Sequence, residues 1–110
     1  MNRQLQLDHF SLALHRRAID ALRADPTLNA RVRQTLTRWR SQAGETRSDA
    51  LWSEWEQVLS DEPDALARAA LSETDHGQLM RSVSPLGVLV TQRERTALLS
   101  QSRGYVALSQ

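Results

Sequence analysis

The chain lacks cysteine and lysine altogether, and its 110 residues include only four glycines and three prolines. Without cysteine, neither a disulfide framework nor a thiolate-based metal or redox site can form. The glycines are scattered, which excludes the glycine-rich loop that cradles phosphates in nucleotide-binding proteins. The sequence also has no run of about 18 apolar residues and no apolar segment near its start. We therefore expect a cytoplasmic protein without disulfides, signal peptide or membrane span.

The composition is that of a small soluble domain. Apolar residues make up 40% of the chain and charged residues 25%, which are ordinary values for a globular protein. A mass of 12.4 kDa corresponds to one domain that buries roughly two-thirds of the surface of its unfolded chain. We therefore expect a single compact domain over residues 1–110.

All 14 basic residues are arginines, and they are unevenly distributed. Residues 1–47 hold nine arginines and four acidic residues, a net charge of +5. Residues 48–110 hold five arginines and nine acidic residues, a net charge of −4. Such an asymmetry is typical of a protein with a charged binding surface. It is equally typical of a small domain whose two halves attract each other, and the sequence leaves both interpretations open.

Apolar residues recur at helical spacing along nearly the whole chain, and the two-residue alternation of strands is almost absent. Leu28, Val32, Leu36 and Trp39, for example, form one continuous apolar face. Gly77 weakens one of the expected helices by about 1 kcal/mol relative to alanine. The fold class is therefore all-α, a single domain of five or six short helices. We expect these helices over about residues 8–24, 26–42, 49–60, 63–72, 75–83 and 92–102, followed by an apolar tail over 105–110.

Several helix ends carry recognisable capping signals. Asp25 and Pro26 suit the N-cap and first helical position of the second helix, and Gly44 ends it. Thr91 and the glutamate three residues later form a capping box, in which each side chain accepts a hydrogen bond from the other residue's backbone N–H. Gly104 is then expected to end the last helix.

The chain offers no arrangement of residues that suggests catalysis. Of its three histidines, His9 and His15 are six residues apart and so face different sides of a helix, and His76 is distant in sequence. No H-E-x-x-H motif or calcium-loop spacing is present, and Glu54 and Glu56 point in different directions. We expect the histidines to be solvated or capping residues. The protein is therefore expected to be no enzyme and to hold no metal or cofactor.

The segment "VLVTQRERTALLSQSRGY" resembles the start of the helix-turn-helix domain of LuxR-type response regulators. In that family the segment forms a scaffold helix, and a turn and a recognition helix follow it. Only six residues follow Gly104, whereas a helix that reads the major groove needs about ten. We therefore expect this segment not to read DNA in that way.

Three other segments carry a second resemblance, over roughly residues 12–100. They are "LALHRRAIDALRADPTLNARVRQTLTRW", "LWSEWEQVL" and "RSVSPLGVLVTQRER". Together they resemble a group of small, all-helical bacterial proteins encoded beside a larger gene, in pairs that look like toxin–antitoxin systems. The residues that carry the resemblance are His15, Ile19, Leu22, Arg23, Asp25 and Pro26, then Leu51, Trp55, Val58 and Leu59, and finally Arg81, Ser84, Pro85, Gly87, Val88, Leu89, Glu94 and Arg95.

This resemblance implies a non-enzymatic protein that neutralises or assists a larger cognate protein encoded nearby. Tryptophan is enriched at binding hot spots, and Trp52 is the best candidate of the three tryptophans because its neighbours can close the core without it. Arg81, Arg93 and Arg95 offer bidentate hydrogen bonds to carboxylates of the partner. The expected partner-binding residues are Trp52, Arg81, Ser84, Pro85, Arg93, Glu94, Arg95 and Tyr105.

Two alternatives remain open from the sequence. The arginine-rich N-terminal half is also typical of a nucleic-acid-binding regulator, whose arginines would then share one exposed surface. The tryptophans could instead hold together a homo-oligomeric structural module. The expected nucleic-acid-binding residues of the first alternative are Arg16, Arg17, Arg31, Arg38 and Arg40.

Overall fold

The structure, a computed structural model, describes the backbone of residues 3–109 and the side chains of residues 6–103. These residues form six α-helices and one short 3-10 helix, and none of the described residues forms a strand. The predicted all-α fold is confirmed. In chain order the helices are α1 (Arg3–Ala24), α2 (Leu28–Ala43), α3 (Asp49–Ser60), α4 (Pro63–Ala70), α5 (Asp75–Ser82), the 3-10 helix η1 (Leu86–Leu89) and α6 (Gln92–Ser109).

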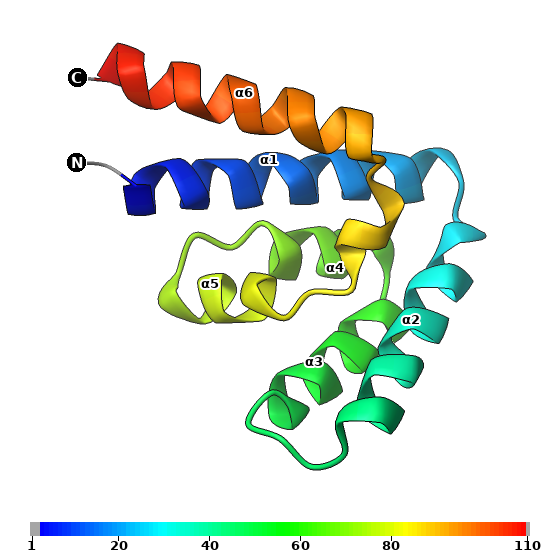
Figure 1. The fold of residues 1–110 in the computed structure, drawn as a ribbon. Coiled ribbons are helices and arrows are strands. Elements are labelled where there is room, and N and C mark those ends of the chain that lie inside the picture. Colours follow the sequence, from blue (N-terminus) through cyan, green and yellow to red (C-terminus); the bar gives the residue numbers. More distant parts are fainter. Residues whose placement is uncertain (1–2, 110) are drawn as a thin grey trace.

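The helices are arranged in two parts around one core. The last helix, α6, lies antiparallel along α1 (Figure 1). Helices α2 and α3 form a hairpin that extends away from this pair, and α4, α5 and η1 lie between the two (Figure 1). The first and last helices are thus neighbours, which brings residues from both ends of the sequence to the same region.

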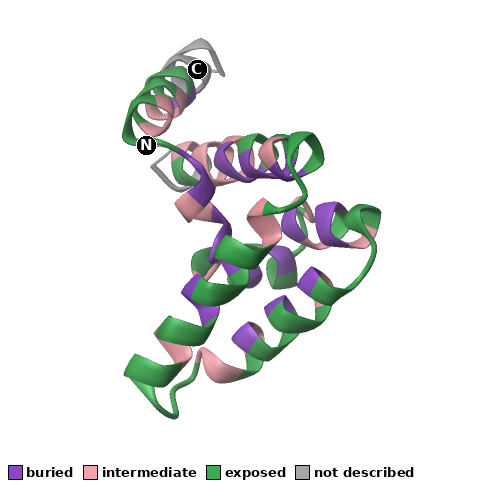
Figure 2. Ribbon diagram, turned by 90° about the vertical axis from the view of Figure 1, so that its right-hand side faces the viewer, coloured by how far each residue is buried: buried purple, intermediate pink, exposed green. Residues whose placement is uncertain are grey.

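The core is formed by the sides of the helices that face one another (Figure 2). Trp55 lies at its centre with no exposed surface, and its indole N–H donates a hydrogen bond to the backbone oxygen of Met80 at 2.9 Å. This bond satisfies the only polar group that the burial of the indole removes from water. The other buried apolar residues are Leu14, Ala18, Ile19, Leu22, Val32, Leu36, Trp52, Leu59, Leu66, Ala67, Ala70, Met80, Leu86, Leu89 and Val90.

Most of the predicted helix ends are confirmed. Thr91 accepts a hydrogen bond from the N–H of Glu94 at 3.1 Å, and Glu94 accepts one from the N–H of Thr91 at 3.0 Å, so the capping box forms. Pro63 occupies the first turn of α4, and Gly44 follows α2 with a φ of 67°, where a residue with a Cβ would be strained. These ends are local features, which explains why the sequence predicts them.

Three helix boundaries differ from the prediction. Helix α2 begins at Leu28, because Asp25 accepts a hydrogen bond from the N–H of Thr27 at 3.1 Å and so closes a turn before the helix. Helix α1 begins earlier than predicted, and α6 continues through Gly104 to Ser109 instead of ending near residue 102. A glycine within a helix costs only about 1 kcal/mol of stability relative to alanine. Packing of the helix against a neighbouring helix can outweigh this cost. The short helix η1 was not predicted.

The uneven charge is explained by contacts between the two halves of the chain. Arg17 pairs with Glu94, Arg23 lies 3.8 Å from Asp64, and Arg40 binds both Asp49 and Glu56, at 2.8 and 2.9 Å. Each pair joins an arginine of residues 1–47 to an acid of residues 48–110. These exposed pairs stabilise the fold little individually, but they confirm the attraction between the halves.

Candidate functional site

A cavity of about 200 Å³ lies between α1, the end of α5, η1 and the start of α6. No acidic residue is among those that line it, whereas two arginines are. The cavity therefore presents positive charge that its own lining does not balance. The lining residues are Phe10, Ser11, Leu14, His15, Arg81, Ser84, Gly87 and Arg95.

Two other hollows are present among the described residues. One of about 440 Å³ shares Arg81 with the cavity and contains acidic as well as basic side chains, among them Asp8, Arg16 and Glu73. The other, of about 210 Å³, lies where α1, α2 and α4 meet, and its walls are mainly apolar. The cavity next to α6 is the one in which residues of the predicted site meet.

Arg81 forms one wall of the cavity and is only 7% exposed. Its Nη1 donates hydrogen bonds to the backbone oxygens of Ala70, at 3.2 Å, and Ser72. Both bonds come from Nη1, and the side chain lines both the cavity and the neighbouring hollow. No carboxylate of the described residues pairs with this guanidinium, and burial lowers the pKa of Arg81 in spite of the attraction of Asp8 and Glu73. Arg81 is thus a fixed, buried cation without a close counterion.

Arg95 reaches the cavity from the first turn of α6. Its Nη2 donates to the backbone oxygen of Gly87 at 3.0 Å, which fixes the guanidinium against η1. Gly87 leaves room for this contact, because a Cβ there would lie 3.3 Å from Nη2 of Arg95. Ser84 accepts a hydrogen bond from the N–H of Leu86 at 3.1 Å, so its hydroxyl hydrogen remains able to donate.

His15 forms the inner wall of the cavity and is 3% exposed. Its Nδ1 donates to the backbone oxygen of Ser11 at 2.7 Å, and its ring stacks on Trp55 with the ring centres 6.5 Å apart. Burial lowers the pKa of His15 to about 4, and the charge of Arg81 adds to this effect. The ring is therefore neutral at pH 7, and its Nε2 has no hydrogen-bond partner among the described residues.

The prediction that the histidines are solvated or capping residues is therefore wrong for His15, which is buried. His9 is half-buried and shares a hydrogen bond with Ser102 at 2.8 Å. Only His76 is exposed, and it binds Glu54 at 2.7 Å. The sequence did indicate that His15 could be buried, because it stands four residues before the apolar Ile19 and so lies on the same side of α1, which is buried.

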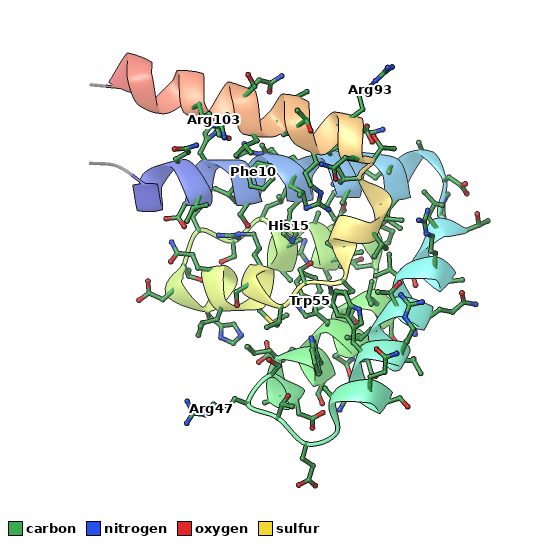
Figure 3. The ribbon with its side chains drawn as sticks, viewed as in Figure 1. Phe10, His15, Arg47, Trp55, Arg93 and Arg103 are labelled. Atoms are coloured by element: carbon green, nitrogen blue, oxygen red, sulfur yellow. The ribbon has the colours of Figure 1, made fainter. Side chains whose placement is uncertain are left out.

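The predicted partner-binding residues between Arg81 and Tyr105 have different surroundings. Arg81, Ser84 and Arg95 meet at the cavity, together with His15, which was not among the predicted partner-binding residues. Glu94 is engaged by the capping box and by Arg17, whose hydrogen bonds lower the pKa of its carboxyl. Arg93 points away from the molecule (Figure 3). Pro85 is fully buried, so it forms no exposed contact, and the side chain of Tyr105 lies outside the described residues.

Trp52 is part of the core, and the prediction that the core closes without it is wrong. Its side chain is 9% exposed, and its indole N–H donates to the backbone oxygen of Val83 at 3.0 Å. Its ring also packs against Trp39, with the ring centres 6.4 Å apart. The end of α5 covers this side of α3, a contact that the spacing within α3 does not reveal. Of the three tryptophans, Trp39 alone is half-exposed, and an oligomer held by tryptophans stays a prediction.

Replacing Trp52 with phenylalanine is expected to lower the free energy of unfolding by about 2 kcal/mol. The variant loses the indole hydrogen bond and leaves the partly buried oxygen of Val83 without its donor. Urea denaturation measures the change. Trp39→Phe is the matched control, since Trp39 is half-exposed, and it should lose less than about 1 kcal/mol. Equal, small losses in both variants would contradict the role of Trp52 in the core.

The five arginines expected to bind nucleic acid face different neighbours. Arg17 turns towards Glu94 of α6, Arg40 towards Asp49 and Glu56 of α3, and Arg16 lines the hollow that faces α5. Arg31 and Arg38 are exposed on α2. The contacts of the first three involve different elements and do not bring these arginines together, and nucleic-acid binding stays a prediction.

Among the described side chains, no group of three or more acidic, histidine or cysteine residues is placed to hold a metal ion. None of the described helices has the length and apolar character needed to cross a membrane. Comparison with protein-family models, with curated proteins and with solved structures finds no match to this chain.

Proposed function

We propose that this chain is a non-enzymatic, partner-binding protein, the antitoxin-like member of a bacterial gene pair. It would neutralise or assist a larger protein encoded beside it by covering a functional surface of that protein. The resemblance in the three sequence segments suggests this class of function, and the structure contributes a site through which such binding can occur.

The observation that carries the proposal is the meeting of Arg81, Ser84 and Arg95 at one cavity next to His15. Each guanidinium is held by a backbone oxygen of the chain itself. Groups that are fixed before binding lose little conformational entropy when a partner arrives, which favours recognition. A rigid, arginine-lined cavity therefore suits an acidic group on the surface of another protein.

Arg93 is the member of the predicted site that can extend this contact. It stands next to Glu94 at the start of α6 and is exposed, so it can meet a partner without any change in the fold. An arginine at the rim of an interface mainly raises the rate of association, whereas a buried one mainly slows dissociation. We therefore assign Arg95 to the centre of the contact and Arg93 to its rim.

Co-purification tests the proposal. The tagged chain is expressed from its own locus, and mass spectrometry identifies what it retains. We expect a stoichiometric protein encoded by the adjacent gene. Arg95→Gln should weaken the complex about tenfold, while Arg38→Gln on α2 should leave it unchanged and serves as the control for loss of charge. Recovery of nucleic acid at low salt, with no stoichiometric protein, would contradict the proposal and favour the regulator.

A further inference from the structure

The cavity combines two features that seldom occur together in a folded protein. Arg81 is almost completely buried, yet its hydrogen bonds go to uncharged backbone oxygens and not to a carboxylate. Buried charges are normally paired, because an unpaired ion loses its hydration without compensation. A second arginine, Arg95, lies on the same cavity, and the neutral ring of His15 does not offset either charge.

The donors that remain define what the cavity can hold. Nε and Nη2 of Arg81 take no part in its two hydrogen bonds, and Arg95 uses only Nη2. The hydroxyl of Ser84 can donate as well, since its oxygen already accepts a hydrogen bond. An occupant must therefore bring several acceptor atoms and negative charge into a small space, which is the chemistry of an oxyanion.

Charge and volume distinguish a carboxylate from a phosphate. Asp8 and Glu73 already attract Arg81 from the neighbouring hollow, so the excess positive charge is less than that of two free arginines. A single negative charge comes closer to balancing this excess than a double charge does, and both acids repel a dianion more strongly than a carboxylate. An engineered cavity of about 150 Å³ holds benzene in another protein. The roughly 200 Å³ available here therefore accommodates the side chain of an aspartate or a glutamate.

We propose that the cavity lined by Arg81, Ser84 and Arg95 is a carboxylate-binding site, and that its occupant is a carboxylate of the cognate protein. The second part rests on the proposed function, whereas the first depends only on the chain itself. The carboxylate accepts hydrogen bonds from both guanidinium groups and from the hydroxyl of Ser84. It supplies the counterion that the buried Arg81 lacks.

Sodium acetate is the probe for the first part, and acetamide, which has nearly the same shape but no charge, is the matched control. Each is added to the ¹⁵N-labelled full chain at constant ionic strength, and the Nε–H signals of Arg81 and Arg95 are followed by NMR. Acetate should cause saturable shifts with a Kd on the order of 1 mM, and acetamide should cause none. Shifts that sodium chloride reproduces, or tighter binding of inorganic phosphate, would overturn the proposal.

Two variants connect the binding to the cavity. Arg81→Gln is unsuitable alone, because loss of a buried side chain with two hydrogen bonds can unfold the chain. Arg95→Gln should weaken acetate binding about tenfold, and Arg103→Gln, which removes the same charge from the same helix outside the cavity, should change it less than about twofold. Equal effects of the two variants would mean that acetate responds to general charge and would refute the site.

The purified complex tests the source of the carboxylate. If the partner fills the cavity, an excess of acetate should lower the apparent affinity of the complex while acetamide leaves it unchanged. A complex that ignores acetate would refute the partner as the source and leave a site for small carboxylates. If the chain binds acetate but forms no complex, the proposed function alone is refuted. If the chain forms a complex but binds no acetate, the carboxylate site alone is refuted.

Discussion

The substitution Gly77→Ala is expected to lower the free energy of unfolding by about 3 kcal/mol. Gly77 is buried in the first turn of α5, and a Cβ on it would lie 2.2 Å from the backbone oxygen of Ser72. That oxygen belongs to the main chain, so the segment before α5 would have to move. Alanine favours the helix by about 1 kcal/mol, which is too little to compensate.

The movement would also disturb the candidate site, because the same oxygen of Ser72 accepts a hydrogen bond from Arg81. Gly87→Ala is the appropriate control, since a Cβ on Gly87 would meet side chains and no backbone, with Nη2 of Arg95 at 3.3 Å and Cδ2 of Leu14 at 3.9 Å. Its cost should be below about 1 kcal/mol. Urea denaturation of both variants measures the difference. A Gly77→Ala variant as stable as the unmodified chain would mean that α5 does not approach Ser72 so closely.

Gly77 also illustrates what the sequence could and could not predict. Helix propensity alone predicts that this glycine destabilises a short helix. The sequence does not indicate that a backbone carbonyl of the preceding segment lies against it. The capping box of Thr91 and Glu94, the start of α4 at residue 63 and the turn at Gly44 were predicted correctly. Each of these depends on residues within four positions of one another.

The candidate site depends on contacts between distant residues, and there the prediction was incomplete. Arg81 and Arg95 were selected as partner-binding residues from their segment, but burial of Arg81 requires α1 and α5 to pack together. Trp52 was expected on the surface because α3 alone can form a core stripe without it. The spacing of apolar residues within one segment shows which side of that helix is apolar. It does not show which side a second helix will cover, because that depends on the tertiary fold.

The stability of the protein is expected to fall as the pH decreases below about 6.5, because of His15. The pKa of this histidine is lowered from 6.5 to about 4 in the folded chain. Between these values the unfolded chain binds the proton and the folded chain does not, so acid favours unfolding. The contribution of His15 to the free energy of unfolding is complete above pH 6.5 and is lost as the pH falls from 6.5 towards 4. The loss relative to neutral pH is about 2 kcal/mol at pH 5 and about 3 kcal/mol at pH 4.

Urea denaturation at pH 7 and pH 5 measures this loss, and His15→Leu should abolish most of it because leucine does not titrate. Comparing the two chains at each pH cancels the contribution of carboxyl groups such as that of Glu94, whose pKa is also lowered. His76→Gln is the control for the loss of an exposed histidine and should keep the full pH dependence. An unchanged slope in His15→Leu would show that the ring is not buried in its neutral form. The wall of the cavity next to Arg81 would then be charged at mildly acidic pH, and that charge would change how the site attracts a carboxylate.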